Sequence, residues 1–343
     1  MAILTTCIGA YPKPAYVPRM RWFHDVAQVG DADAEALSRS ERTAIFDRAT
    51  QEVVAEQADI GIDIPTDGEI RRANYIHYHC SHLDGFDPDT QIETTMRNGA
   101  YVDIVPAFTG KVAPREPFLI RDWEIAQAAT DKPVKITVPG PLTISDSTAN
   151  TFYRDRESWC ADLADALNVE IRRLADAGCS HIQVDEPLFA RLPGEALAFG
   201  VDNLERCFHG VPDRVTRTMH MCCGYPDKLD ETDYVKARPE VYQGLAEAVD
   251  ASLIDAVSIE DAHQHNDLSL LEKFANTTVI FGAVEVASSR IEEVDEIADR
   301  LRKALDHIDA ERLIAAPDCG LIMLGGELAR AKLAKLVEAA RLV

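Results

Sequence analysis

Short apolar runs alternate with longer amphipathic segments along this chain, and this alternation restricts the fold more than any other feature of the sequence. A helical pattern from Ser40, SERTAIFDRATQEVVAEQADIGI, has a serine at its expected N-cap and ends at Gly61, and IDIPTDGE follows it as a strand entering a loop. The same order recurs with the strand-like runs KPVKITVP, HIQVDEPLF, RVTRTMHMCC, IDAVSIE, TTVIFGAVEV and RLIAAPDC. Such alternation predicts a parallel sheet with β-α-β crossovers.

A single α/β domain, the (β/α)8 or TIM barrel, is the arrangement predicted for residues 1–343. No linker rich in Gly, Ser or Pro and no change of composition divides the chain. A doubly wound fold would carry a glycine-rich fingerprint after its first strand, and CIGAYPKP does not match G-x-G-x-x-G. The missing fingerprint also argues against a dinucleotide cofactor.

Polar side chains gather directly after the predicted strands. In barrel enzymes the active site is built from the loops at the C-terminal ends of the strands. We therefore expect these side chains to meet at one mouth of the barrel: Asp67, Glu69, Asp185, Glu186, His220, Cys222, Glu260 and Cys319.

The charge balance and the cysteine content limit the partners and the location. Lys+Arg 35 against Asp+Glu 58 gives a formal net charge of -23, which argues against nucleic acid or a membrane surface as a partner. No apolar run approaches the roughly 20 residues of a membrane span, and the opening MAILTTCIGAYPKP does not resemble a signal peptide, so a cytoplasmic location is expected. In a reducing cytosol the eight cysteines favour buried thiols or metal ligands over disulfides.

Four of the polar side chains are candidate zinc ligands. His220, Cys222, Glu260 and Cys319 supply nitrogen, sulfur and carboxylate donors from three consecutive strand ends, and catalytic zinc takes such donors in a tetrahedron that leaves room for substrate. The H-x-C pair alone is compatible with an ordinary strand end. The glutamate in SIED and the cysteine in APDCG, each after a later strand, favour the metal site.

With these motifs in place, the chain resembles the catalytic half of cobalamin-independent methionine synthase. The similarity lies in HMCC (220–223), SIE (258–260) and PDCGL (317–321), and it extends over nearly the whole chain through IGAYP (8–12), TDGE (66–69), GPLT (140–143) and QVDEP (183–187). Full-length members of that family carry a second, amino-terminal copy of the barrel. The resemblance implies a short core form with the catalytic barrel alone.

The resemblance also implies roles for individual residues. Zn²⁺ would be held by His220, Cys222, Glu260 and Cys319, and the substrate would be homocysteine, which is methylated to methionine. Glu69 and Asp185 would hold the homocysteine ammonium group, with Asp185 counted among the catalytic residues. The loop of Ile8, Gly9 and Ala10 would meet the carboxylate.

The charge of such a site explains why it suits a thiol substrate. Zn²⁺ with two thiolates and one carboxylate carries one net negative charge, so exchanging Glu260 for a substrate thiolate leaves the charge unchanged and the sulfur electron-rich. A free thiol with a pKa of about 8.5 is mostly protonated at neutral pH, and metal coordination removes that proton. The predicted reaction is therefore in-line attack of sulfur on a methyl or alkyl carbon.

Three departures from the family pattern leave the methyl donor open. Ala10 stands where a serine is common, Ser147 where a tryptophan is expected to stack on the folate pterin, and Ala287 where a histidine is proposed to protonate the folate. These changes argue against methyltetrahydrofolate. A methylated corrinoid protein or another alkyl donor is compatible with the remaining residues.

We expect more general roles for several further side chains. His263 and His265 follow Glu260 and are candidate proton carriers, with His263 the preferred catalytic residue. Glu186 is expected to be structural, and Cys223 is expected to face away from the metal because side chains alternate along a strand. The cluster of His77, His79 and His82 is interpreted as a substrate-loop segment rather than a second metal site. The other cysteines, Cys7, Cys80, Cys160, Cys179 and Cys207, are interpreted as ordinary.

Alternative functions use the same residues differently. A zinc enzyme that adds a coenzyme M-like thiol to an epoxide would need a cation for the sulfonate, and Arg71 and Arg72 are candidates. A metal-free lyase similar to uroporphyrinogen decarboxylase would have no use for the His/Cys/Glu/Cys set. A protein that stores or senses zinc or a thiol without turnover is a further alternative.

Overall fold

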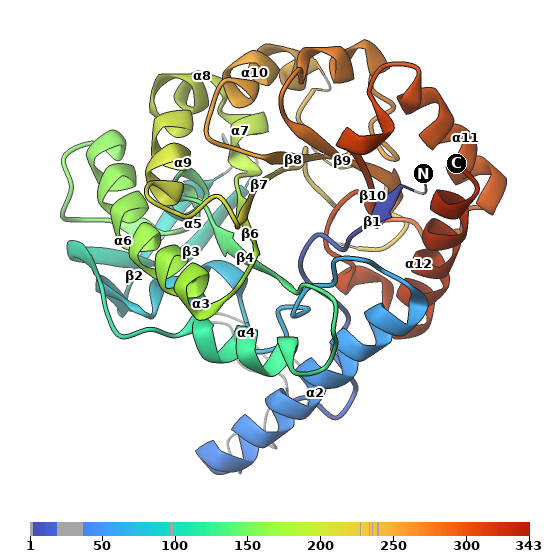
Figure 1. Cartoon of the computed structure of the whole chain (residues 1–343). Coiled ribbons are helices and arrows are strands. Elements are labelled where there is room, and N and C mark those ends of the chain that lie inside the picture. Colours follow the sequence, from blue (N-terminus) through green and yellow to red (C-terminus); the bar gives the residue numbers. More distant parts are fainter. Residues whose placement is uncertain are drawn as a thin grey trace.

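The computed structural model describes residues 3–18, 37–96, 99, 101–226, 228–232, 234, 236–238 and 240–343. Its centre is a curled parallel sheet with helices packed around the outside (Figure 1). Seven strands follow the order β1-β10-β9-β8-β7-β6-β4. Their bounds are β1 Leu4–Thr5, β4 Lys135–Pro139, β6 His181–Asp185, β7 Thr216–Met221, β8 Ala256–Ile259, β9 Thr278–Val284 and β10 Leu313–Pro317. This arrangement confirms the α/β fold with a parallel sheet.

The predicted strand in IDIPTDGE lies between the two edges of this sheet. Thr6 bridges to Ile64 and Thr66 bridges to Lys135, both in parallel. The N–H of Ile64 donates to the Thr5 carbonyl at 3.0 Å, and the N–H of Lys135 donates to the Pro65 carbonyl at 2.8 Å. Pro65 itself has no N–H to donate, so the segment forms two isolated bridges instead of a continuous ladder.

The two longest helices begin and end where the sequence supplies caps. Helix α2 (Arg39–Ile60) has a capping box in which Ser38 accepts from the Glu41 N–H and the Glu41 side chain accepts from the Ser38 N–H. The N-cap is thus Ser38 rather than Ser40. Gly61 ends the helix with φ 110, a left-handed conformation that glycine adopts without steric cost. Helix α6 (Arg156–Ala177) is capped by Asp155 and ends at Gly178 in the same way.

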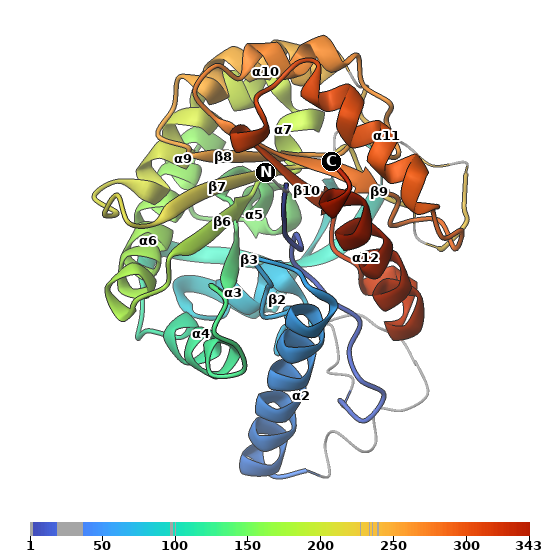
Figure 2. The same ribbon diagram turned by 45° about the vertical axis from the view of Figure 1, so that its right-hand side comes forward.

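Shorter helices connect the remaining strands. In Figures 1 and 2 the helices surround the sheet, and α12 lies beside β1, so that the two ends of the chain are neighbours. No helix in the part of the chain that the structure describes is long and apolar enough to cross a membrane. The bounds are α4 Leu119–Gln127, α5 Pro141–Ser147, α7 Leu188–Arg191, α8 Pro193–Glu195, η1 Ala196–Gly200, α9 Val201–Phe208, α10 Glu240–Asp250, η2 Leu268–Lys273, α11 Val294–Leu305, η3 Ala310–Arg312, η4 Ile322–Leu324 and α12 Gly326–Arg341.

A second, smaller sheet was not predicted from the sequence. Strands β2 (Leu83–Met96) and β3 (Tyr101–Pro114) form a long antiparallel hairpin, and β5 (Ala149–Asn150) adds to β3 in parallel. The hairpin follows α3 (Tyr75–Cys80), and its strand β3 packs against α6 (Figure 1). Pro88 and Pro106 make this stretch resemble a loop, and the β2–β3 pairing register shifts across Pro88.

Candidate active site and metal centre

A cavity of about 380 Å³ is lined by residues that follow several strands of the parallel sheet. Its lining brings together most of the predicted site residues: Ile8, Gly9, Ala10, Glu69, Asp185, His220, Cys222 and Cys319. The parallel topology explains this convergence, because the C-terminal ends of neighbouring strands meet at one edge. Asp185 pairs directly with His220 in the β6–β7 register.

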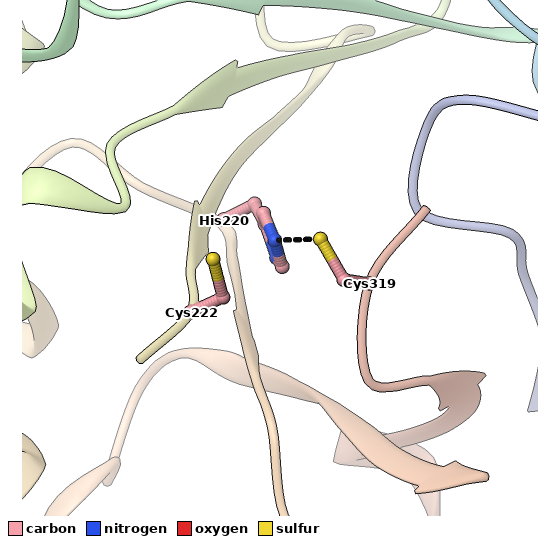
Figure 3. A group of neighbouring side chains, drawn as sticks. All are labelled: His220, Cys222 and Cys319. Atoms are coloured by element: carbon pink, nitrogen blue, oxygen red, sulfur yellow. Dashed lines mark hydrogen bonds between the residues drawn. The ribbon is translucent and has the colours of Figure 1, made fainter. Parts of the chain in front are cut away.

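Three side chains in this lining place their donor atoms close together. Ligand atoms of His220, Cys222 and Cys319 all lie within 4.8 Å of one another, and Figure 3 shows the imidazole of His220 with the Cys319 thiol beside it. His220 Nε2 lies 3.4 Å from Cys319 Sγ, and Nδ1 lies 2.9 Å from Ser258 Oγ. Ser258 therefore fixes the ring so that Nε2 faces the sulfur atoms, as an outer partner does for a metal-binding histidine.

The donor set fits a zinc ion better than it fits two isolated thiols. The neighbouring Cys319 thiol and burial hold the pKa of Cys222 well above its ordinary value. A bound cation reverses this effect, because it favours the deprotonated thiolate. One nitrogen and two sulfurs are donors that zinc takes in proteins.

Glu260, the fourth predicted ligand, has other partners. Its carboxylate is fully buried at the end of β8. Tyr225 Oη donates to Oε2 at 3.1 Å, and Lys236 Nζ donates to Oε1 at 3.2 Å. Among the described residues, Glu260 is not part of the three-residue donor group. Tyr225 lines the cavity, whereas Glu260 is not among its lining residues.

Asp318, which the sequence analysis did not single out, links the loops of two predicted ligands. Its Oδ1 accepts from the N–H groups of Asp261 and Ala262 at 2.9 Å each, and its Oδ2 accepts from the N–H of His263 at 2.8 Å. Asp318 precedes Cys319, and the accepted N–H groups follow Glu260. The only sequence signal was a carboxylate adjacent to a ligand cysteine.

The loop of residues 8–10 is held from several sides. Thr66 Oγ1 donates to the Gly9 carbonyl at 2.8 Å, and the Leu321 N–H donates to the Ala10 carbonyl at 2.7 Å. A Cβ on Gly9 would lie 2.6 Å from Glu69 Oε1, so glycine is required for the carboxylate to approach this loop. The predicted substrate loop and the predicted ammonium ligand are therefore in close contact.

Glu69 and Asp185 present two buried carboxylates to the same cavity. Burial raises the pKa of Glu69 to about 7, against the opposing effect of Arg72, whose Nη1 lies 3.5 Å from Oε1. Thr137 Oγ1 also donates to Glu69 Oε1 at 2.7 Å. Burial likewise raises the pKa of Asp185, while His220 lowers it. The negative charge of Asp185 also raises the pKa of Glu69, and a ligand ammonium ion would favour the ionised form of both carboxyl groups.

The neighbouring Glu186 has a structural role. Its carboxylate accepts from the N–H groups of Leu142 and Thr143 at 2.9 and 3.0 Å and from Thr143 Oγ1 at 2.7 Å. These groups lie in the first turn of α5, whose free N–H groups favour a negative charge. Gly140 leaves space for this contact, because a Cβ there would lie 2.2 Å from Glu186 Cδ.

His263 is placed outside the described cavity lining. Its Nε2 accepts from the N–H groups of Val286 and Ala287, both at 3.1 Å. Burial, together with nearby Lys236, lowers the pKa of His263 to about 3, so the ring is neutral at physiological pH. Its assignment as a proton carrier stays a prediction.

The histidines near α3 and the arginines after TDGE are engaged elsewhere. His77 Nε2 lies 3.1 Å from the Ser147 carbonyl, and His79 Nδ1 lies 2.6 Å from the Tyr75 carbonyl. Arg71 is paired with Asp47 and Asp122, and Arg72 with Asp67 and Glu69. Because both guanidinium groups already have carboxylate partners, the structure gives no support to a sulfonate site at Arg71 and Arg72.

The fold is that of an α/β enzyme, and its candidate active site is the cavity at the C-terminal edge of the parallel sheet. The model of the catalytic domain of the cobalamin-independent synthases matches residues 3–342. The chain belongs to this family, whose members are methyltransferases.

Individual relatives cover almost the whole chain. The methionine synthase of Pyrococcus abyssi is 30% identical over 342 residues, covering 99% of this chain and 92% of its own length. That of Saccharolobus solfataricus is 28% identical over 342 residues, covering 99% and 94%. A structure of a B12-independent methionine synthase from Shewanella sp. W3-18-1 in complex with selenomethionine is 29% identical, with a TM-score of 0.88 over 100% of this chain and 98% of the other.

Proposed function

We propose that the protein is a zinc-dependent thiol methyltransferase that transfers a methyl group to homocysteine to form methionine. One observation carries this proposal: a cavity whose wall holds a His/Cys/Cys donor group also holds two buried carboxylates. A thiol-activating metal and an ammonium site are the two features that a thiol-bearing amino acid requires. The names of the relatives agree with this substrate.

His220 Nε2, Cys222 Sγ and Cys319 Sγ are the proposed zinc ligands, with Glu260 as the fourth. When bound, zinc supplies a positive charge that lets a thiol lose its proton at neutral pH while it stays nucleophilic. The protein supplies the positioning: Ser258 orients the imidazole, and Asp318 fixes the loop after Glu260.

Substrate orientation is assigned to other residues of the same cavity lining. Glu69 and Asp185 are proposed to bind the ammonium group, and the loop of Ile8, Gly9 and Ala10 is proposed to meet the carboxylate. Both carboxylates are buried, so an ammonium ion that replaces water beside them gains a strong charge-assisted hydrogen bond. Asp185 also neighbours His220 in the sheet, which supports its proposed role beside the reacting sulfur.

The proposed catalytic domain is the whole chain, residues 1–343, as one closed (β/α)8 barrel. The bridges of Thr6 to Ile64 and of Thr66 to Lys135 support this proposal, because segment 63–66 then joins the two edges of the seven-stranded sheet.

The methyl donor in this proposal is either a folate or a methyl-corrinoid protein. Ala10 and Ser147, two of the three departures from the family pattern, both line the cavity. Tyr75, Leu188 and Ile322 give the same lining an apolar portion, which suits the approach of a methyl group.

Metal analysis and X-ray absorption at the zinc edge test this function. The purified protein is expected to bind one zinc with two sulfur ligands, and homocysteine is expected to add a third sulfur. Cys319→Ser should lose zinc and methyl transfer together, whereas the control Cys179→Ala, which removes a buried thiol away from the cavity lining, should keep both. A zinc-free Cys319→Ser variant with full activity would contradict the metal mechanism.

A further inference from the structure

The Glu260 carboxylate is held by two side chains that are not among the metal donors. Its buried carboxylate is bonded on one oxygen to Tyr225 Oη at 3.1 Å and on the other to Lys236 Nζ at 3.2 Å. The Glu260 side chain is 0% exposed and the Lys236 side chain is 19% exposed. Both oxygens of a buried anion are thus satisfied, one of them by a cation.

Lys236 is held in place by the backbone next to it. The N–H of Ala237 donates to the Cys223 carbonyl at 3.0 Å, and Gln264 Nε2 donates to the Ala237 carbonyl at 3.1 Å. Cys223 follows the ligand Cys222, and Gln264 lies in the loop after Glu260. Lys236 is therefore anchored to both loops that carry proposed ligands.

The position of Tyr225 connects this pair to the substrate cavity. Tyr225 lines the cavity together with Cys222 and Cys319, and its hydroxyl reaches Glu260 on the other side. Tyr225 therefore contacts both the cavity and the Glu260 carboxylate.

Electrostatics explains why the metal site needs such a pair. If the proposed function is correct, a substrate thiolate that replaces Glu260 leaves the charge at the metal unchanged, so the released carboxylate is the group that loses its cation. A buried charge without a partner is strongly destabilising. Lys236 and Tyr225 give that carboxylate a second cation and a second hydrogen-bond donor within the same buried region.

We propose that Tyr225 and Lys236 form an off-metal seat for Glu260, which holds this carboxylate whenever it is not a metal ligand and so lowers the cost of substrate thiolate entry. This inference rests on the proposed zinc-dependent function. Both residues are positioning residues, because they act on the reaction only through Glu260.

The test compares Lys236→Met, Lys236→Arg and Tyr225→Phe with the control Lys273→Met, which removes a lysine that pairs with the exposed Glu247. Zinc affinity is measured without substrate by competition with a chelator. The oxygen and sulfur ligands are counted by X-ray absorption during a homocysteine titration.

Lys236→Met is expected to bind zinc more tightly, on the order of tenfold, because only the metal-free form loses an ion pair. The homocysteine concentration that exchanges oxygen for sulfur at the metal should rise by a similar factor, and KM should rise more than kcat falls. Lys236→Arg should restore part of both effects. Tyr225→Phe should change the zinc affinity and the homocysteine concentration for exchange in the same direction, but by smaller factors. It serves as the second variant if Lys236→Met does not fold.

Two results would overturn this inference and leave the proposed function intact. If zinc binds and homocysteine adds a sulfur, but Lys236→Met and Tyr225→Phe behave like Lys273→Met, the proposed function stands and the seat does not exist. If Lys236→Met binds zinc more weakly, Lys236 supports the metal-bound form instead of competing with it. A wild-type protein that binds no zinc would instead overturn the proposed function, and the seat with it.

Discussion

Replacing Asp318 by asparagine should loosen the metal site without removing any ligand. The carboxylate accepts three backbone N–H groups, from Asp261, Ala262 and His263, at 2.8 to 2.9 Å. An asparagine amide has one oxygen, so it can keep the two bonds at Oδ1 while its NH₂ group faces the N–H of His263. One charge-assisted bond is lost, a buried donor is left unsatisfied, and the two remaining bonds become neutral.

The expected cost is about 3 kcal/mol, because a hydrogen bond to a charged group contributes roughly 1.5–3 kcal/mol and a neutral one about 1. Urea unfolding of the metal-free protein measures this change in the free energy of unfolding. Zinc affinity should fall in the same variant, because the loop that carries Glu260 is bonded less strongly to the residue before Cys319.

A matched control tests whether the effect comes from the three hydrogen bonds of Asp318 or from any Asp-to-Asn change. Asp87 also accepts backbone N–H groups, from Asp89 and Thr90, but it lies in β2 where the pairing register shifts, and its carboxylate is less buried than that of Asp318. Asparagine makes the same kind of side-chain bond to the backbone two residues on. Asp87→Asn should therefore unfold like the wild type. An Asp318→Asn protein with unchanged stability and unchanged zinc affinity would refute the reasoning.

Three further substitutions test the space and charge around the site. Gly282→Ala should displace the Asp318 carboxylate from its hydrogen bonds, because the added Cβ would lie 2.1 Å from Asp318 Oδ1. Zinc affinity should therefore fall, and wild-type affinity in this variant would contradict the packing argument. Gly9→Ala should displace the Glu69 carboxylate, because the added Cβ would lie 2.6 Å from Glu69 Oε1. The KM for homocysteine should rise about tenfold while the zinc content stays unchanged, which steady-state kinetics and metal analysis measure. Glu69 has a pKa raised from 4.5 to about 7 by burial, so the folded state binds its proton more tightly than the unfolded state, and stability should fall between about pH 4.5 and 7 as the pH rises. Calorimetric binding of methionine, which has no thiol to titrate, should strengthen as the pH rises through 7 in the wild type and stay flat in Glu69→Gln; equal profiles would argue against Glu69 as the ammonium ligand.

The parts of the site that could be predicted from the sequence are those fixed by strand topology. In a parallel sheet with one register, a polar residue at the C-terminal end of a strand faces the same mouth as its neighbours, as the direct pairing of Asp185 with His220 shows. A shift of one residue would turn His220 to the opposite face. The convergence of His220, Cys222 and Cys319 therefore follows once the strands are located.

The hairpin of β2 and β3 could not be predicted in the same way. Local pattern is its only sequence signal, and Pro88 and Pro106 interrupt that pattern at the positions where a ladder needs N–H donors. The irregular register absorbs Pro88, which is a tertiary solution that no local pattern contains.

Glu260 marks the limit of prediction from residue type. A carboxylate at a strand end can bind a metal, a lysine or both in turn. Which partner it binds depends on the free energy of each interaction in the folded site, and the residue type does not give this. The competing partner, Lys236, comes from a stretch that has no periodic pattern, and the backbone contacts of Ala237 help to hold this stretch in place. Residue type therefore predicts which side chains can act as zinc donors. Under the proposed function, the competition of Tyr225 and Lys236 for Glu260 would decide how many of them bind the metal before substrate does.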